Sequence, residues 1–231
     1  MKIIGLIGGM SWESSLVYYE LINKKVKELL GGLHSSKSIM LSVDFAEIEK
    51  YQHENDWDSL DKLMISAAIK LELAGADLIV LCTNTMHLCS DKIINNISIP
   101  FLHIAEATGQ KIVTSKLKKV ALLGTKFTME KDFYKKILSE NYDIEVLIPS
   151  EKERQIIHDI IYTELVLGKI TTTSKEIYKE IISNLEKRGA EGVILGCTEI
   201  PLLISDSDVN IPIFNTTEIH AEKAVEIALK E

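Results

Sequence analysis

The feature that most constrains this chain is an internal repeat that covers most of its 231 residues. An apolar run ends at Cys82, and a second apolar run in the matching place of the other half ends at Cys197. The two cysteines are 115 residues apart (197 − 82), and Gly8 and Gly124, which end the first apolar run of each half, are 116 apart (124 − 8). Anchors in the same order at nearly equal offsets predict a duplicated structural unit.

Short apolar, β-branched runs alternate with helical patterns in both halves. Ser11 is expected to cap a first helix that ends at Leu30. Because strands that alternate with helices form parallel sheets covered on both faces, we predict an α/β fold of two similar doubly wound parallel-sheet domains. These are residues 1–112 and 113–231, with the final helix at about 217–231 packing back on the first domain. Strands are expected at 2–7, 38–44, 77–81, 99–103, 119–123, 143–148, 191–196 and 211–214.

Composition excludes several classes of function. The net charge is −8 (26 basic minus 34 acidic residues), and no basic stripe is interleaved with aromatic residues, so nucleic acid is not an expected partner. No apolar run reaches the roughly 20 residues of a membrane span, and the N-terminus lacks the pattern of a signal peptide. Three cysteines are an odd number and argue against a disulfide framework. We therefore expect a cytoplasmic protein that does not bind membranes.

The two repeated cysteines predict acid–base chemistry by thiols. One thiol from each half implies an active site between the domains, with a thiol on either side of a substrate carbon. Each cysteine precedes an expected helix start, where backbone N–H groups and the helix dipole favour a thiolate. One thiolate could then remove an α-proton while the opposite thiol donates one. Hydroxyl and amide groups that could bind a substrate carboxylate follow the two cysteines: Thr83, Asn84, Thr85 and Thr198.

Other uses of these residues are weaker predictions. Buried cysteines are common small core residues, and this is the expected role of Cys89, which has no partner in the second half. Cys82, His87, Cys89 and Cys197 could form a metal set, but their spacing is not a familiar zinc pattern, so no metal is predicted. The Gly8-Gly9-Met10 turn lacks the spacing of a dinucleotide fingerprint, and no lysine stands out for pyridoxal phosphate. The sequence favours chemistry without a cofactor.

Several motifs resemble the aspartate/glutamate racemase family over almost the whole chain. The resemblance implies two α/β domains with a cleft between them, a homodimer, and cofactor-independent racemisation of amino acids by Cys82 and Cys197. By the same resemblance Met10 lies against the substrate, while the threonines and the asparagine listed above bind its α-carboxylate or α-ammonium group. The matching segments are Gly8-Gly9-Met10-Ser11-Trp12-Glu13-Ser14, Val43-Asp44-Phe45, Cys82-Thr83-Asn84-Thr85-Met86-His87 and Gly196-Cys197-Thr198-Glu199-Ile200.

The chain departs from the aspartate-specific pattern of that family at two positions. Gln52 stands in the segment where strict aspartate racemases carry an arginine, and Val166 replaces a lysine. Because a second carboxylate would lack a charged partner, we expect Gln52 to bind a substrate with a neutral or polar side chain, as in the broad-specificity branch. Lys126 or Lys169 could still supply a charge, so aspartate or glutamate racemisation remains an alternative.

Two further alternatives belong to other classes of function. One is a related reaction, such as racemisation of a hydantoin or isomerisation of a dicarboxylate. The other is a non-catalytic amino-acid-binding protein, although binding alone does not need two opposed thiols. The sequence also leaves two roles open for Glu199, which could tune the neighbouring thiol or cap the following helix.

Overall fold

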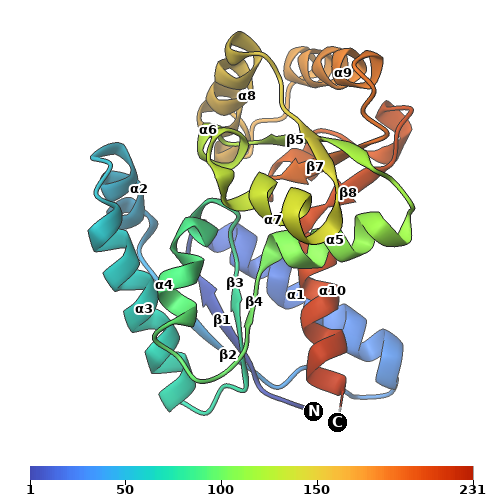
Figure 1. Cartoon of the computed structure of the whole chain (residues 1–231). Coiled ribbons are helices and arrows are strands. Elements are labelled where there is room, and N and C mark those ends of the chain that lie inside the picture. The colour runs from blue at the N-terminus through green and yellow to red at the C-terminus, as the bar shows by residue number, and fades with distance from the viewer. Residues whose placement is uncertain (231) are drawn as a thin grey trace. The chain divides into compact units, whose positions relative to one another are not determined.

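The computed structural model describes residues 1–230, and its internal contacts divide the chain into two units (Figure 1). The first unit contains Met1–Ile104 together with the described residues from His220 onward, and the second contains Ala105–Ile219. The sequence-based boundary after residue 112 falls inside helix α5 (Ile104–Thr114), nearly all of which belongs to the second unit.

The first unit is built on a four-stranded parallel sheet. Its order is β2-β1-β3-β4, and β1 and β3 are completely buried. The strands are β1 (Ile4–Gly8), β2 (Ser38–Ser42), β3 (Leu78–Leu81) and β4 (Phe101–Leu102). The helices are α1 (Trp12–Leu30), α2 (Phe45–His53), α3 (Trp57–Leu73), α4 (Ser90–Ile94) and the part of α10 (Thr216–Leu229) from His220 onward.

The second unit repeats this architecture. Its parallel sheet has the order β6-β5-β7-β8, the same order as the first sheet when each strand is counted within its own unit. The strands are β5 (Lys119–Gly124), β6 (Glu145–Leu147), β7 (Gly192–Gly196) and β8 (Ile213–Asn215). Besides α5, its helices are α6 (Lys126–Glu130), α7 (Asp132–Tyr142), α8 (Glu151–Thr163) and α9 (Thr172–Lys187). The predicted fold class of two parallel-sheet α/β domains is confirmed.

The first helix shows how local sequence sets an element. Ser11 is its N-cap, as predicted, and its hydroxyl accepts a hydrogen bond from the backbone N–H of Ser14 at 3.3 Å. Tyr18, Ile22 and Val26 recur every four residues and are buried, so they form the face that packs on the unit's core. The helix ends at Leu30, next to Gly31, whose φ of 70° suits a residue without a side chain.

The apolar pattern predicts helices at about 83–94, 130–139 and 151–167, and each of them is interrupted in the structure. The segment after Cys82 forms a 3₁₀ helix, Thr85–Cys89, before α4 begins. Lys131 adopts an extended conformation between α6 and α7, and Glu164 departs from helical angles between α8 and a 3₁₀ helix at Leu165–Leu167. Apolar periodicity predicts which residues face the core, but it does not register a single residue that leaves the helical conformation.

Three buried histidine rings lie against one another in the first unit. His87 lies 4.6 Å from His103 and 5.6 Å from His220, measured between ring centroids. His220 Nδ1 pairs with the Tyr18 hydroxyl at 2.8 Å, and its Nε2 donates to the Leu102 carbonyl at 2.9 Å. One nitrogen that donates and one that accepts describe a neutral ring. Burial lowers the pKa of His103 to about 3 and that of His220 to about 4.

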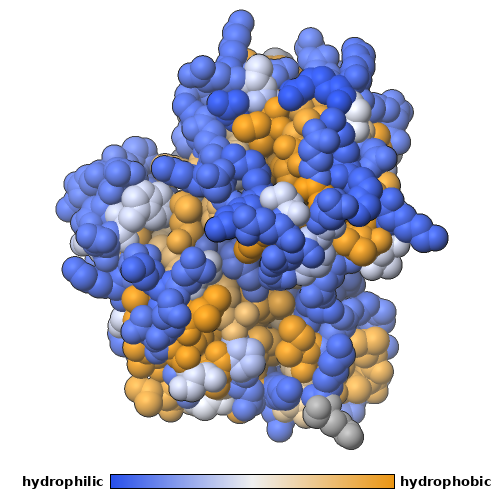
Figure 2. All heavy atoms as spheres, viewed as in Figure 1, coloured by the Kyte–Doolittle hydropathy of each residue, from blue (hydrophilic) through white to orange (hydrophobic). Residues whose placement is uncertain are grey.

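None of the helices within residues 1–230 could span a membrane. No helix there combines the length and the apolar character that a bilayer span requires. Figure 2 shows one face of the molecule, on which hydrophilic residues form most of the surface and apolar residues appear between them.

The buried histidines predict a loss of stability in mild acid. Their pKa values lie below the ordinary 6.5, so the unfolded chain binds more protons than the folded chain as the pH falls from about 6.5 toward 4. At pH 5, His220 alone should cost on the order of 2 kcal/mol of unfolding free energy. Urea unfolding at pH 7.5 and pH 5 measures this loss, which His220→Gln should reduce and the exposed control His34→Gln should leave unchanged. Equal stability of the wild type at both pH values would contradict the prediction.

Candidate functional site

In the first unit, the predicted site residues collect at the carboxyl ends of two paired strands. Gly8 is the last residue of β1, and Cys82 directly follows β3. The two strands are parallel neighbours, and the backbone N–H of Cys82 donates to the carbonyl of Ile7 at 2.9 Å. Ligands of open α/β sheets bind at this end of the strands, so this edge is the candidate site of the first unit.

The turn after β1 depends on a close backbone approach at Gly9. Its φ is 94°, and a Cβ atom built there would lie 2.2 Å from the carbonyl oxygen of Val43. The N–H of Gly9 donates to the hydroxyl of Ser15 at 2.7 Å, so this amide is already hydrogen-bonded within the protein. The turn places Met10 in a buried position, where it belongs to the core cluster beside α3.

The segment after Cys82 is held from two sides. His87 Nδ1 donates to the carbonyl of Thr83 at 2.8 Å, and Asn84 and Thr85 are buried. Gln52, at the end of α2, is also buried, and its amide Nε2 approaches the sulfur of Met86 at 3.2 Å. Gln52 is therefore packed against the cysteine-bearing segment rather than free on the surface.

In the second unit, Cys197 occupies the equivalent place. It directly follows β7, whose neighbour β5 ends at Gly124. A Cβ atom on Gly196 would lie 2.9 Å from the carbonyl oxygen of Leu123, so a small residue before the cysteine lets the two strands stay close. The side chain of Cys197 is half-buried and packs against the core of this unit.

The carboxylate of Glu199 accepts two side-chain hydrogen bonds at this point. Cys197 Sγ donates to its Oε2 at 2.9 Å, and the Thr198 hydroxyl donates to the same oxygen at 2.7 Å. The 3₁₀ helix Ile200–Leu202 that follows has no side-chain cap. Of the two roles left open by the sequence, Glu199 takes the first, because it contacts the thiol and does not cap the helix.

The prediction that helix N-termini favour thiolates at the two cysteines is wrong. Only short 3₁₀ helices follow them, and the pKa of both thiols is raised. At Cys82 burial is the sole cause, since no charged neighbour contributes. At Cys197 burial contributes most, and the negative charge of Glu199 raises the pKa of the thiol further.

The charged residues considered for a substrate carboxylate are occupied or exposed. The chain has two arginines, and both donate hydrogen bonds within the protein. Arg154 donates to the Glu130 carboxylate at 2.9 Å, and Arg188 donates to the Ile148 carbonyl at 3.0 Å. The ammonium group of Lys126 donates to a glutamine side chain at 2.8 Å, and Lys169 is exposed. Val166 packs against the same core as Cys197.

The four residues weighed as a metal set are not assembled as one. The Nε2 of His87 accepts from the backbone N–H of Ile104 at 3.1 Å while its Nδ1 donates to a carbonyl, so both ring nitrogens are used. Cys89 is buried in the core and is hydrogen-bonded to Asp61. Within residues 1–230, no group of three or more histidine, cysteine, aspartate or glutamate side chains is arranged to hold a metal ion.

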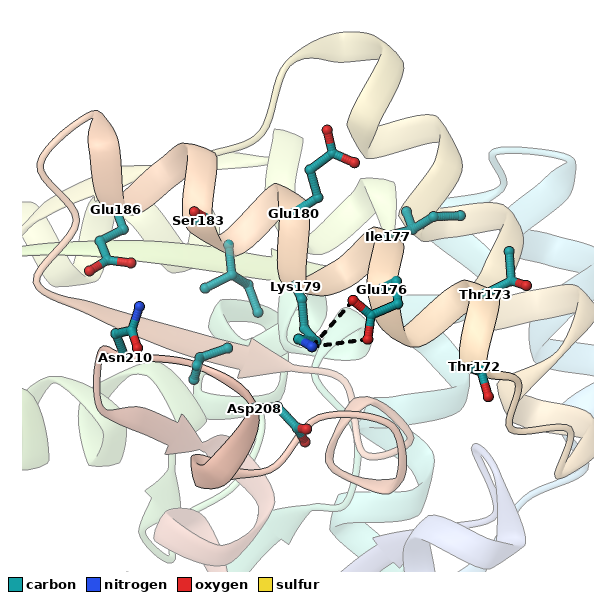
Figure 3. A pocket seen from close by; sticks show the side chains of 12 residues that line it. Thr172, Thr173, Glu176, Ile177, Lys179, Glu180, Ser183, Glu186, Asp208 and Asn210 are labelled. Atoms are coloured by element: carbon teal, nitrogen blue, oxygen red, sulfur yellow. Dashed lines mark hydrogen bonds and ion pairs between the residues drawn. The ribbon is translucent and has the colours of Figure 1, made fainter.

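A groove of the second unit is lined by residues that do not include Cys197. It has a volume of about 750 Å³ and runs along α9, and Glu176, Glu186 and Asp208 are among the residues that line it (Figure 3). Lys179 pairs with Glu176 at 2.9 Å within it. Because the candidate reactive thiol of this unit is absent from its lining, we assign no chemistry to this groove.

Comparison with known proteins identifies the family. The model of the Asp/Glu/hydantoin racemase family matches residues 7–224. The chain belongs to this family. It is therefore an isomerase of the amino-acid racemase class.

Three relatives of this racemase cover almost its full length. The broad-specificity amino-acid racemase RacX of Bacillus subtilis is 26% identical, with 96% of each chain covered. A Yersinia pestis protein provisionally named an Asp/Glu racemase is 50% identical, with a TM-score of 0.95 and all of both chains covered. An aspartate racemase homologue of Pyrococcus horikoshii is 38% identical, with a TM-score of 0.87 and the same coverage.

Sequence reasoning missed one buried residue that interacts with the Cys197 segment of the second unit. Tyr178, on α9, is fully buried, and its pKa is raised chiefly by burial and further by the negative charges of the nearby Glu164 and Glu199 carboxylates. Nothing in the sequence links a tyrosine on one helix to a cysteine nearly 20 residues later. In the racemase Tyr178 belongs to the core cluster of the second unit against which Cys197 also packs.

The Gly9 turn predicts a steric effect that can be separated from backbone strain. Gly9→Ala should destabilise the racemase by about 3 kcal/mol or more, because the new methyl group meets the Val43 backbone in addition to the unfavourable φ. Gly75→Ala is the matched control, since its φ of 95° is nearly the same but nothing lies within 4 Å of the added carbon. It should cost about 1 kcal/mol. Equal unfolding free energies of the two variants, measured in urea, would contradict this account.

Proposed function

We propose that this racemase interconverts L- and D-amino acids without a cofactor, using Cys82 and Cys197 as an acid–base pair. The observation that carries the proposal is the matched placement of the two thiols. Each directly follows the strand that pairs with the first strand of its unit, β3 in one and β7 in the other. A reaction that inverts a carbon needs one proton acceptor and one proton donor of similar chemistry, and the duplicated fold supplies them.

In the proposed reaction the α-proton of the substrate passes to one cysteine. The thiolate of one residue takes the proton from Cα, and the thiol of the other donates its proton to the opposite face. The charge that develops on the α-carboxylate needs fixed hydrogen-bond donors in a site closed to water. The substrate-binding role proposed for Thr83, Asn84, Thr85 and Thr198 is to supply such donors, while Met10 provides an apolar contact.

A neutral or polar substrate side chain fits the described residues better than a second carboxylate. Gln52 offers an uncharged amide beside the Cys82 segment, and Val166 offers an aliphatic side chain on the same core that Cys197 packs against. Arg154 already pairs with the Glu130 carboxylate, and Arg188 is exposed and donates to the Ile148 carbonyl. The name of the Bacillus relative agrees with this choice. The name of the Pyrococcus relative favours the second candidate, an aspartate or glutamate racemase.

We further propose that the racemase works as a homodimer in the cytoplasm. All three cysteines are free thiols, the form that a reducing compartment maintains. Helix α1 exposes a row of large apolar side chains, Trp12, Leu16 and Tyr19, at spacings of four and three residues. Such a row is typical of a surface that pairs with a second copy. A mass of one chain in solution, by light scattering, would contradict the dimer.

The substrate class predicts a specific exchange pattern. In deuterated water and without added cofactor, the purified racemase should remove the α-proton NMR signal of neutral amino acids such as homoserine, methionine and glutamine, and that of arginine. It should act at least tenfold more slowly on aspartate and glutamate, because a buried carboxylate without a charged partner is costly. The double variant Cys82→Ser/Cys197→Ser controls for contaminating racemases.

Each other pattern of exchange contradicts part of the proposal. Exchange confined to aspartate or glutamate would keep the chemistry and refute the specificity argument. Exchange of a hydantoin alone would point to a related reaction. Thermal stabilisation by an amino acid that is never exchanged would identify a binding protein.

A further inference from the structure

In the second unit the candidate reactive thiol of Cys197 is hydrogen-bonded to a carboxylate, that of Glu199. The thiol donates to Glu199 Oε2 at 2.9 Å, and the carboxylate is buried. The Thr198 hydroxyl donates to the same oxygen and so fixes its position. A buried carboxylate at hydrogen-bond distance from a thiol is placed to receive its proton directly, without a water molecule between them.

The backbone around Cys197 can stabilise the negative charge that the sulfur carries after it has lost its proton. The backbone N–H groups of Thr198 and Glu199 are hydrogen-bonded to the thiolate form and oppose the rise in the pKa of this cysteine. Two donors aimed at a sulfur stabilise negative charge on it. Cys197 therefore has an acceptor for its proton on one side and donors for its charge on the other.

The matching position in the first unit lacks this arrangement. Asn84 stands 115 residues before Glu199, the same offset that separates the two cysteines (199 − 84 = 115). An asparagine amide cannot take up a proton at neutral pH. The two thiols of the repeat are thus chemically unequal, although the strands that hold them are equivalent.

A carboxylate beside a thiol is not by itself a sign of catalysis in this chain. Cys89 is hydrogen-bonded to Asp61, yet it is completely buried within a 3₁₀ helix of the first unit. Cys197 differs because it is half-buried and stands at a strand end. Cys89 and Asp61 thus form a second thiol–carboxylate pair, and we propose no role for it in the reaction. Cys89 can therefore serve as an internal reference for Cys197.

We propose that Glu199 is a positioning and proton-holding residue that shares one proton with Cys197. This inference rests on the proposed racemase reaction. In the resting protein both cysteines are thiols and Glu199 is a carboxylate. The Cys197 proton then moves to Glu199, the Cys197 thiolate takes the α-proton from the substrate, and Cys82 donates its proton to the other face. The racemase is left with a Cys82 thiolate, a Cys197 thiol and a protonated Glu199.

Every form in this sequence carries two protons on the three groups. The final form is the one that acts on the opposite enantiomer, and it returns to the resting form by passing the Glu199 proton to Cys82 through solvent. Because activation does not change the proton count, kcat/KM should be nearly independent of pH across the neutral range. Without Glu199, activation requires loss of a proton to solvent, so kcat/KM should rise about tenfold per pH unit below the thiol's pKa.

Alkylation of the cysteines tests the pairing independently of any substrate. The variant is Glu199→Gln, whose amide oxygen can still accept from Thr198, and the matched control is Glu140→Gln, an exposed glutamate of the same unit. At pH 8, iodoacetamide should modify Cys197 at least tenfold faster in Glu199→Gln than in the wild type, because the charge opposing the thiolate is gone. Peptide mass spectrometry follows each site, and the rates at Cys82 and Cys89 should not change. An unchanged rate at Cys197 would overturn the pairing.

The pH profile of racemisation tests the proton transfer itself. Between pH 6 and 8, the wild type and Glu140→Gln should give a flat kcat/KM, while Glu199→Gln should give a line of slope near one in log units. A flat profile in Glu199→Gln would reduce Glu199 to a structural role and overturn the inference. If the wild type exchanges no amino acid, the proposed function fails, and the alkylation result still decides whether the thiol and carboxylate are paired.

Discussion

The pairing of two adjacent parallel strands in each unit is the constraint on which the rest of the structure depends. β1 with β3, and β5 with β7, are almost entirely buried and end at the same edge of their sheets. Small residues allow this: a Cβ on Gly124 would lie 2.8 Å from the Gly196 carbonyl oxygen. Everything at the two candidate sites, from the Gly9 turn to the Glu199 contact, follows directly from where these strands stop.

The sequence was sufficient to predict this framework and the position of both thiols. The alternation of apolar strands with helical patterns predicts the fold. The nearly equal offsets between Gly8 and Gly124 and between Cys82 and Cys197 predict where the strands end. These signals are local or periodic, so they can be recognised in the sequence without knowing how the elements pack. The interruption of the helix at Lys131 is not periodic, and it could not be predicted in this way.

The features that could not be predicted from the sequence depend on burial and on contacts between distant residues. Helix N-termini favour thiolates, but burial outweighs that effect at Cys82, and burial is a property of the assembled core. The packing of Gln52 on Met86 joins residues 34 positions apart, which no spacing rule predicts. Glu199 was visible as a neighbour of Cys197, but its orientation toward the sulfur rather than the helix emerged only from the fold.

If each thiol serves one face of the substrate carbon, as we propose, single cysteine variants in deuterated water should reveal it. Cys82→Ser should exchange the α-proton of one enantiomer without inverting it, because Cys197 still removes and returns a proton on its own face. Cys197→Ser should do the same for the other enantiomer, and both should lose racemisation by about 10³-fold. Cys89→Ser should behave as the wild type. Exchange with undiminished inversion in either single variant would contradict the two-thiol account.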